Sequence, residues 1–269
     1  MNTEASTPTP TSIPTLQLSN VSTYINAELS LHEIELNLNA GEVVAIVGPN
    51  GAGKTSLLRA ICSEMRLTEG EISFAGEDIN QWSLERKAKA LAVLPQRSSL
   101  EFPFTVSEVV AMGRIPHSSS HQHNQEIVAA ALELVDCSQF ADRFYINLSG
   151  GEKQRVQLAR VAAQIWNASE THRCLILDEP SSSLDLAHQE MVLNLIRNFS
   201  QQGVAVLTVL HDLNLASKCA DRILVLHLGQ VVACGPPEEV VTEELLANVF
   251  DINAQVTENP KDDSILVIV

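Results

Sequence analysis

The sequence predicts an α/β fold built on a mostly parallel sheet. Three short apolar runs, at residues 43–47, 174–177 and 204–210, are typical of strands buried on both faces. A segment with the apolar spacing of a helix follows each run, and this alternation is the pattern of a parallel sheet covered by helices. Residues 15–22 and 32–39 instead alternate between apolar and polar side chains, which indicates an antiparallel sheet with one wet face.

Length and composition suit a chain with a large core. With 269 residues, 45% of them hydrophobic, the chain fits one large domain or one domain with a subdomain. The five cysteines lack paired spacing, which favours reduced, packed thiols over a disulfide frame or a zinc site. The formal net charge of −16 argues against nucleic acid and against electrostatic adhesion to anionic lipid.

The two ends of the chain differ from its middle. Residues 1–14 are rich in Thr, Pro and Ser and lack an apolar segment, so we expect a disordered tail and no ordinary secretory signal. No apolar run reaches the roughly 18 residues that cross a bilayer. We expect the main domain over residues 15–257 and a C-terminal tail or strand over residues 258–269.

The middle of the chain has helical periodicity. Residues 105–112 and 125–134 carry apolar side chains at helical spacing, which predicts a helical subdomain inserted from about residue 96 to about residue 168. A polar loop, residues 114–124, is expected between the two helices. It contains His117, His121 and His123, which we interpret as a solvated loop rather than a metal site because no carboxylate or cysteine supports them.

The first buried strand leads into GPNGAGKTS, and a helical segment follows. Glycines let backbone N–H groups face a phosphate, and the helix N-terminus adds partial positive charge. The G-x-x-x-x-G-K-[ST] pattern in this context predicts a nucleoside triphosphate site. In it Lys54 would neutralise the β- and γ-phosphates, and the Thr55 hydroxyl would bind Mg²⁺. The residues expected to hold the nucleotide are Gly48, Pro49, Asn50, Gly51, Ala52, Gly53, Lys54, Thr55 and Ser56.

Polar groups follow the other buried strands. Asp178 and Glu179 end the second run and His211 ends the third. Because ligands bind at the carboxyl ends of strands in an open α/β sheet, we expect these groups to share one site with the phosphate loop. Asp178 is the better Mg²⁺ ligand and Glu179 the better base for an attacking water. We expect their side chains to project to opposite sides because the segment is extended.

Three single residues are candidates for the same site. His211 could contact the γ-phosphate and the water through its imidazole. Gln96 follows the short strand at residues 92–94, and its amide could reach both Mg²⁺ and the water. Tyr24 could stack its ring on a nucleotide base, with ordinary packing as the alternative.

A second glycine-bearing helix start occurs at LSGGEKQ, residues 148–154. Ser149 and Glu152 form the S-x-x-E pattern of a capping box, so the segment is a good helix start in its own right. With Gly150 and Gly151 it is also a second possible anion site. The sequence leaves open whether the two phosphate-binding elements meet within one chain or between two chains.

These motifs, in this order, resemble the ATP-binding subunits of ABC transporters from about residue 16 to residue 256. GPNGAGKTS resembles the Walker A motif, CLILDEP the Walker B motif with its catalytic glutamate, and LSGGEKQ the family signature. Gln96 falls at the Q-loop glutamine, His211 at the switch histidine and Tyr24 at an A-loop aromatic residue. Ser183, within the D-loop sequence SSSLD, stands where alanine is common.

The resemblance implies a P-loop NTPase fold of the ABC cassette type, with a mixed or parallel sheet core, an antiparallel β subdomain and an inserted helical subdomain. It implies ATP and Mg²⁺ as cofactors and a head-to-tail homodimer in which Ser149, Gly150 and Gly151 serve the partner's nucleotide. FPFTVSEVVAMGRIPH resembles the importer branch for iron siderophores, haem and cobalamin. RSSLEFPF, ARVAAQIW, LDLAHQ and VLHDLNLA resemble the ATP-binding subunits of haem (hemin) importers.

As a member of that branch, the chain is expected at the cytoplasmic face of the bacterial inner membrane. Its partners would be a membrane permease dimer and a periplasmic haem-binding protein, with membrane contact only through the permease. Ferric siderophore or cobalamin is the alternative cargo. An ABC ATPase that acts on DNA or ribosomes, or a regulatory module without transport, is the alternative of a different class.

Overall fold

The computed structural model describes residues 13–25, 28–96, 100, 102–167 and 170–269. The largest sheet of these residues has the strand order β10-β9-β3-β8-β7-β6. All neighbouring strands pair parallel except β10, which pairs antiparallel with β9. Its strands are β3 (Val43–Val47), β6 (Leu91–Leu94), β7 (Cys174–Asp178), β8 (Ala205–Val209), β9 (Arg222–His227) and β10 (Gln230–Gly235). The predicted parallel core is confirmed.

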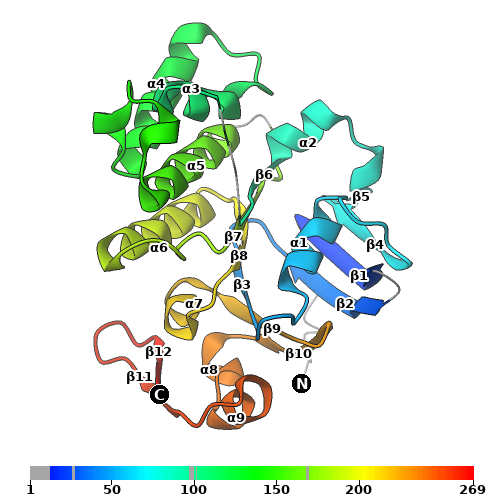
Figure 1. Ribbon diagram of the computed structural model, residues 1–269. Helices are drawn as coiled ribbons and strands as arrows, with labels where there is room; N and C mark the ends of the chain where they lie inside the picture. The colour runs from blue at the N-terminus through cyan, green and yellow to red at the C-terminus, as the bar shows by residue number, and fades with distance from the viewer. Residues whose placement is uncertain (1–12, 26–27, 97–99, 101, 168–169) are drawn as a thin grey trace, which may run out of the picture.

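The second sheet is antiparallel, in the order β2-β1-β4-β5. Its strands are β1 (Leu16–Ile25), β2 (Glu28–Leu38), β4 (Glu69–Phe74) and β5 (Glu77–Asp78). The alternation predicted for β2 is confirmed, since Ile34, Leu36 and Leu38 are buried while Glu35 and Asn37 are exposed. Helix α1 (Lys54–Ile61) lies between the two sheets, and Leu57 packs in a core that both sheets share (Figure 1).

The helical region lies between β6 and β7 in the chain and forms one end of the molecule (Figure 1). Its helices are α3 (Val106–Ala111), α4 (His121–Leu134) and α5 (Gly150–Ile165). The polar loop predicted over residues 114–124 is too long, because Ser120 caps α4 by accepting a hydrogen bond from the His123 N–H. His121 and His123 are therefore helical. The described part of the chain holds no cluster of metal-ligating side chains.

Further helices cover the sheet and extend the chain. Helices α6 (Leu186–Gln201) and α7 (Leu213–Cys219) pack on the sheet as predicted. Helix α2 (Leu84–Ala90) was not predicted, because its sequence, LERKAKA, is mostly charged and lacks an apolar stripe. Its start is marked only by Ser83, whose side chain accepts from the Arg86 N–H. Short 3₁₀ turns lie at Ile79–Gln81, Met112–Arg114, Ser138–Phe140 and Tyr145–Asn147.

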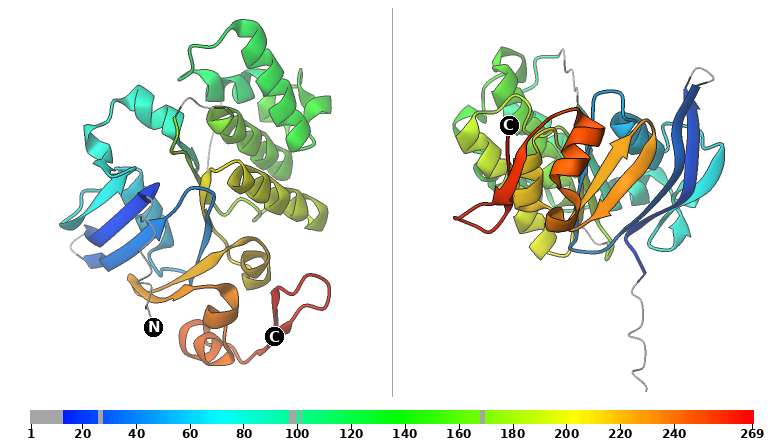
Figure 2. Two further views of the ribbon diagram at one scale, coloured as in Figure 1. Left: turned by 180° about the vertical axis from the view of Figure 1, so that it is seen from behind. Right: turned by 90° about the horizontal axis from the view of Figure 1, so that it is seen from below.

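The C-terminal segment packs on α7 (Figure 2). After α8 (Pro237–Val240) and α9 (Glu243–Phe250), strands β11 (Gln255–Glu258) and β12 (Ile265–Ile268) pair antiparallel. The Asn214 side chain of α7 donates to the Val267 carbonyl at 3.2 Å and accepts from the Val267 N–H at 2.7 Å. The predicted last strand is thus present, and the expected boundary at residue 258 falls inside a hairpin.

The structure also bears on the expectations about cysteines, membrane-spanning segments and the N-terminal tail. All five cysteines are free thiols, as their spacing predicts. Among the described residues, no helix is both long enough and apolar enough to cross a membrane. The tail expected over residues 1–14 lies almost entirely outside the described residues, which begin at Ile13.

Candidate functional site

One cavity, of about 630 Å³, brings together the phosphate loop and groups from the ends of three strands. Gln96 comes from the end of β6, Glu179 from β7 and His211 from β8. The parallel pairing of these strands places their carboxyl ends at one edge of the sheet. The residues that line the cavity are Ser30, Asn50, Gly51, Ala52, Gly53, Lys54, Thr55, Ser56, Gln96, Glu179, His211, Leu228 and Gly229.

The phosphate loop depends on glycine at specific positions. Gly51 and Gly53 have φ of +80° and +104°, a backbone region that favours glycine. At Gly48 an added Cβ would lie 2.1 Å from the Leu226 carbonyl oxygen, so any side chain would collide with β9. Of the residues predicted to hold the nucleotide, Gly48 and Pro49 do not line the cavity. At Gly51 and Gly53 the loop therefore presents backbone without a side chain to the cavity.

Lys54 is the buried cation of the loop. It begins α1, is 6% exposed, and donates from Nζ to the carbonyls of Gly48 at 2.6 Å and Pro49 at 2.9 Å. Burial lowers its pKa, and the nearby charges of Glu179 and Asp178 oppose that shift. The ammonium group thus lies between two backbone carbonyl acceptors, within range of the charges of Glu179 and Asp178.

Glu179 and His211 contact each other in the cavity. His211 Nε2 lies 2.6 Å from Glu179 Oε1. Burial raises the pKa of the Glu179 carboxyl, but hydrogen bonds from Gln96 and His211, with the charges of His211 and Lys54, outweigh burial and leave the pKa below its ordinary value. The premise of an extended segment is wrong at Glu179, whose φ is +53°. Left-handed backbone is unusual for a residue other than glycine and concentrates at functional sites.

Asp178 lies behind the cavity rather than in its lining. It is 6% exposed at the end of β7, and its Oδ1 has no hydrogen-bond partner in the described part of the chain. Burial and the charge of Glu179 raise its pKa. It lines a second cavity of about 390 Å³, to which Gln96 also belongs. A buried carboxylate oxygen without a partner fits a cation, and the chemistry of Mg²⁺, which takes oxygen ligands, matches this group. The Thr55 hydroxyl and the Gln96 amide, the other oxygen donors predicted for Mg²⁺, line the 630 Å³ cavity.

Four other candidate residues do not line the 630 Å³ cavity. Tyr24 is on β1 and 53% exposed. Ser149, Gly150 and Gly151 begin α5, and of these Gly150 lines the second cavity. The capping box is present, because the Glu152 carboxylate accepts from the Ser149 N–H at 2.7 Å and the Ser149 hydroxyl accepts from the Glu152 N–H. The start of α5 therefore does not line the cavity of the phosphate loop in its own chain.

Sequence reasoning missed three residues of the cavity: Ser30, Leu228 and Gly229. The Ser30 hydroxyl donates to the Ser56 hydroxyl at 2.8 Å. The Gly229 N–H donates to the Ala52 carbonyl at 2.9 Å, so the β9–β10 turn is bonded directly to the phosphate loop. Only the turn itself could have been predicted, because a glycine between two short apolar runs is typical of a tight hairpin turn. Its position against the loop depends on the fold.

Sequence comparison identifies the family. Residues 31–182 match the family described as ABC transporter. Curated relatives include the hemin import ATP-binding protein HmuV of Pseudomonas entomophila, which is 47% identical over 88% of this chain and 93% of the relative. The relative of the same name from Myxococcus xanthus is 49% identical over 89% of this chain and 91% of the relative. The chain belongs to the ABC transporter family.

Solved structures agree with this family. A metal-chelate type ABC transporter in an inward-facing conformation has a TM-score of 0.78 and 26% identity, covering 95% of this chain and 97% of that chain. A dimeric ATP-binding cassette in a post-hydrolysis state, bound to ADP and Pi, has a TM-score of 0.71 and 27% identity, covering 82% and 98%. The predicted P-loop NTPase fold of the ABC cassette type is confirmed. As a cassette of this family the chain binds nucleotide and is an ATPase.

Proposed function

We propose that this ABC cassette is the ATP-hydrolysing subunit of a haem (hemin) importer. The assignment of haem as the cargo is based on relatives named hemin import ATP-binding protein, which are 44% to 49% identical over most of the chain. The cassette itself would not touch haem, so the cargo is inferred through the relatives rather than from the cavity. We propose one ABC domain over residues 15–257, with the helical subdomain inserted at about residues 96–168.

The cavity supports specific roles in ATP hydrolysis. The N–H groups of the phosphate loop and the start of α1 would hold the β- and γ-phosphates, and Lys54 would exchange its carbonyl partners for phosphate oxygens. Thr55, Gln96 and Asp178 would hold Mg²⁺, which when bound neutralises charge on the phosphate oxygens. Glu179 would orient the attacking water and accept its proton, while His211 would hold Glu179 and contact the γ-phosphate.

The position of α5 supports a head-to-tail homodimer. Ser149, Gly150 and Gly151 do not line the cavity of their own chain, and a helix N-terminus of this kind attracts anions. We propose that they complete the partner's ATP site. The dimeric neighbour bound to ADP and Pi is consistent with such an arrangement. Tyr24, which is on β1 and half exposed, would stack on the adenine base.

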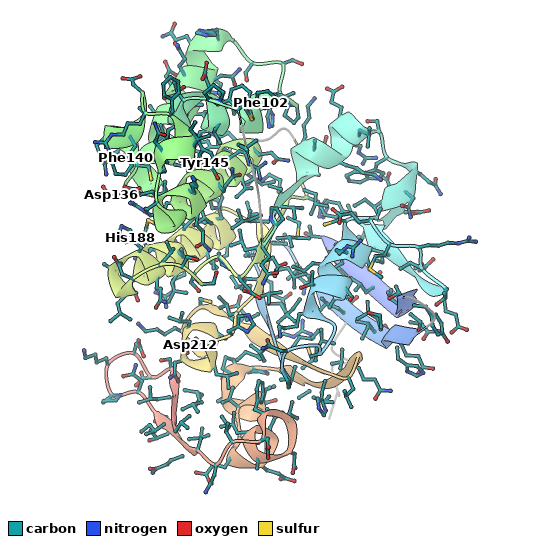
Figure 3. All side chains as sticks on the ribbon, viewed as in Figure 1. Phe102, Asp136, Phe140, Tyr145, His188 and Asp212 are labelled. Atoms are coloured by element: carbon teal, nitrogen blue, oxygen red, sulfur yellow. The ribbon has the colours of Figure 1, made fainter. Side chains whose placement is uncertain are left out.

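A membrane permease dimer is the proposed transport partner, with a periplasmic haem-binding protein that delivers the cargo. The helical region exposes large apolar side chains, with Phe102 71%, Ile115 79% and Phe144 48% exposed. Figure 3 shows Phe102 at the edge of the helical region. Exposed apolar groups favour a protein contact. With a net charge of −16, the chain would reach the cytoplasmic face of the inner membrane through the permease rather than through lipid.

Growth on haem tests the cargo. The source bacterium is grown with haem as the only iron supply, carrying the wild-type chain, Lys54→Ala or the control Lys261→Ala, whose side chain is exposed between β11 and β12. We expect only Lys54→Ala to fail on haem and all strains to grow on ferric siderophore and free iron. Failure of Lys54→Ala on siderophore, or without cobalamin, with normal growth on haem would instead assign that cargo.

The alternative of a different class has its own readout. Purification of the tagged chain from detergent-solubilised membranes should recover a permease. Recovery of ribosomes or DNA in place of a membrane protein would support an ABC ATPase that acts on nucleic acid. The acidic charge favours the first result.

A further inference from the structure

A side chain of α5 is bonded to the backbone of Glu179. Gln154, in the second turn of α5, donates from Nε2 to the Glu179 carbonyl oxygen at 3.0 Å. Gln154 is only partly exposed and lines the second cavity together with Asp178. Figure 1 shows α5 beside the sheet at β7, where Glu179 follows the strand. The bond therefore joins the helical region to the residue proposed as the base.

The backbone that Gln154 contacts is strained. A left-handed φ, here +53°, costs a residue other than glycine on the order of 1–2 kcal/mol and persists only where surrounding contacts hold it. The Glu179 N–H donates to the Val209 carbonyl at 3.2 Å, and the Glu179 carbonyl also accepts from the Ser182 N–H at 3.3 Å. Of these three bonds, the one from Gln154 is the shortest. It is also the only one of the three that comes from the helical region.

The backbone conformation decides where the carboxylate lies. Glu179 Oε1 lies 2.6 Å from His211 Nε2, and its side chain enters the 630 Å³ cavity while Asp178 faces the other one. In extended backbone the two side chains would also diverge, but the carboxylate of Glu179 would take a different direction. A rotation of the Glu179 backbone would therefore move the carboxylate away from His211 and from the phosphate loop.

We propose that Gln154 is a positioning residue for hydrolysis, which holds the Glu179 backbone in the conformation that directs its carboxylate into the nucleotide cavity. This inference rests on the proposed role of Glu179 as the base. Gln154 lies one turn beyond the Ser149 capping box, on the same rigid helix. The helix start proposed to contact the partner's nucleotide is thus linked, through one hydrogen bond, to the hydrolytic residue of its own chain.

The test compares two glutamines of the same helix. Gln154→Met keeps the length of the side chain and removes the donor, and Gln154→Lys keeps a donor. The control is Gln164→Met, because Gln164 is partly exposed on α5 and also donates to backbone carbonyls, those of Ala88 at 2.8 Å and Leu91 at 3.2 Å, away from the cavity. Steady-state ATP hydrolysis, nucleotide affinity and thermal unfolding are measured for all of them and for Glu179→Gln.

We expect kcat of Gln154→Met to fall about tenfold to a hundredfold, as misplacement of a reacting group by an ångström does. KM for ATP and nucleotide affinity should stay within about twofold, since the phosphate loop is unchanged, and Gln154→Lys should recover most of kcat. Gln164→Met should keep wild-type kcat at a similar melting temperature. Wild-type kcat in Gln154→Met, or equal losses in Gln154→Met and Gln164→Met that follow thermal stability, would overturn the inference.

Glu179→Gln distinguishes a failure of the base assignment from a failure of the positioning inference. If this variant loses turnover while Gln154→Met keeps it, the base assignment stands and the positioning inference fails. If Glu179→Gln keeps full turnover, the proposed role of Glu179 fails, and the positioning inference fails with it.

Discussion

Gly150 offers a substitution that should move stability and activity in opposite directions. It is the first residue of α5, and a Cβ added there would meet no atom within 4 Å. Its φ lies outside the left-handed region. Because alanine is favoured over glycine in helices by up to about 1 kcal/mol, Gly150→Ala should unfold at an equal or slightly higher temperature, by about 1–3 °C.

Activity should nevertheless fall. In the proposed dimer the start of α5 lies against the partner's phosphates, and a methyl group there would separate the backbone N–H groups from the oxygens they contact. A hydrogen bond to a charged group contributes about 1.5–3 kcal/mol, so the loss of one such bond corresponds to roughly a tenfold to hundredfold loss of turnover. The expected result is a stable protein with little ATPase activity.

The assay pairs thermal unfolding with steady-state ATP hydrolysis. Gly203→Ala is the control, because its added Cβ also meets nothing within 4 Å but its φ is +79°. We expect Gly203→Ala to lose about 1 kcal/mol of stability and to keep wild-type turnover, since it lies beyond α6 and outside the cavity lining. Wild-type turnover in a well-folded Gly150→Ala would contradict the proposed contact, because α5 would then start away from any nucleotide.

The remaining predictions concern the cavity and the core. Glu179→Gln should lower turnover by about 10² or more while ATP binding survives, as measured by phosphate release and nucleotide titration; full residual turnover would exclude Glu179 as the base. Gly48→Ala should weaken nucleotide affinity, because its Cβ would lie 2.1 Å from the Leu226 carbonyl oxygen, and unchanged affinity would show that β9 yields easily. Arg114→Met should lower stability by about 2–4 kcal/mol in denaturant unfolding, because Arg114 is buried and donates to the Ala163 carbonyl at 2.7 Å; a loss below 0.5 kcal/mol would contradict this.

The elements that were predicted correctly are those whose own residues show a clear pattern of apolar side chains. Burial selects apolar residues, so it can be read directly from residue type. This explains the apolar runs at β3, β7 and β8, which are buried throughout, and the alternation in β2. Helix α2 and the first turn of α4 escaped prediction, because their polar sequences start at serine caps and lack an apolar stripe at that point. A single cap residue is a weak signal without periodicity behind it.

In the candidate site, too, local features were predicted and features that depend on distant contacts were not. Gly51, Gly53 and Lys54 were predicted because a phosphate loop needs positive φ and a cation within a few residues, and a short segment can specify both. The left-handed backbone of Glu179 was not predicted. It is held by contacts from Val209, Ser182 and Gln154, and two of these are distant in the sequence.

Residue order alone was enough to predict groups suited to nucleotide chemistry: a strand, a glycine loop and a helix that suit phosphate, followed by acidic and imidazole groups at strand ends. Tertiary packing sets which groups share a cavity, brings the turn at Leu228 and Gly229 against the phosphate loop, and places the start of α5 outside that cavity. The reason is physical. Residue types and backbone preferences act within a few residues, whereas these contacts depend on the pairing of β9 with β3 and on the packing of α5.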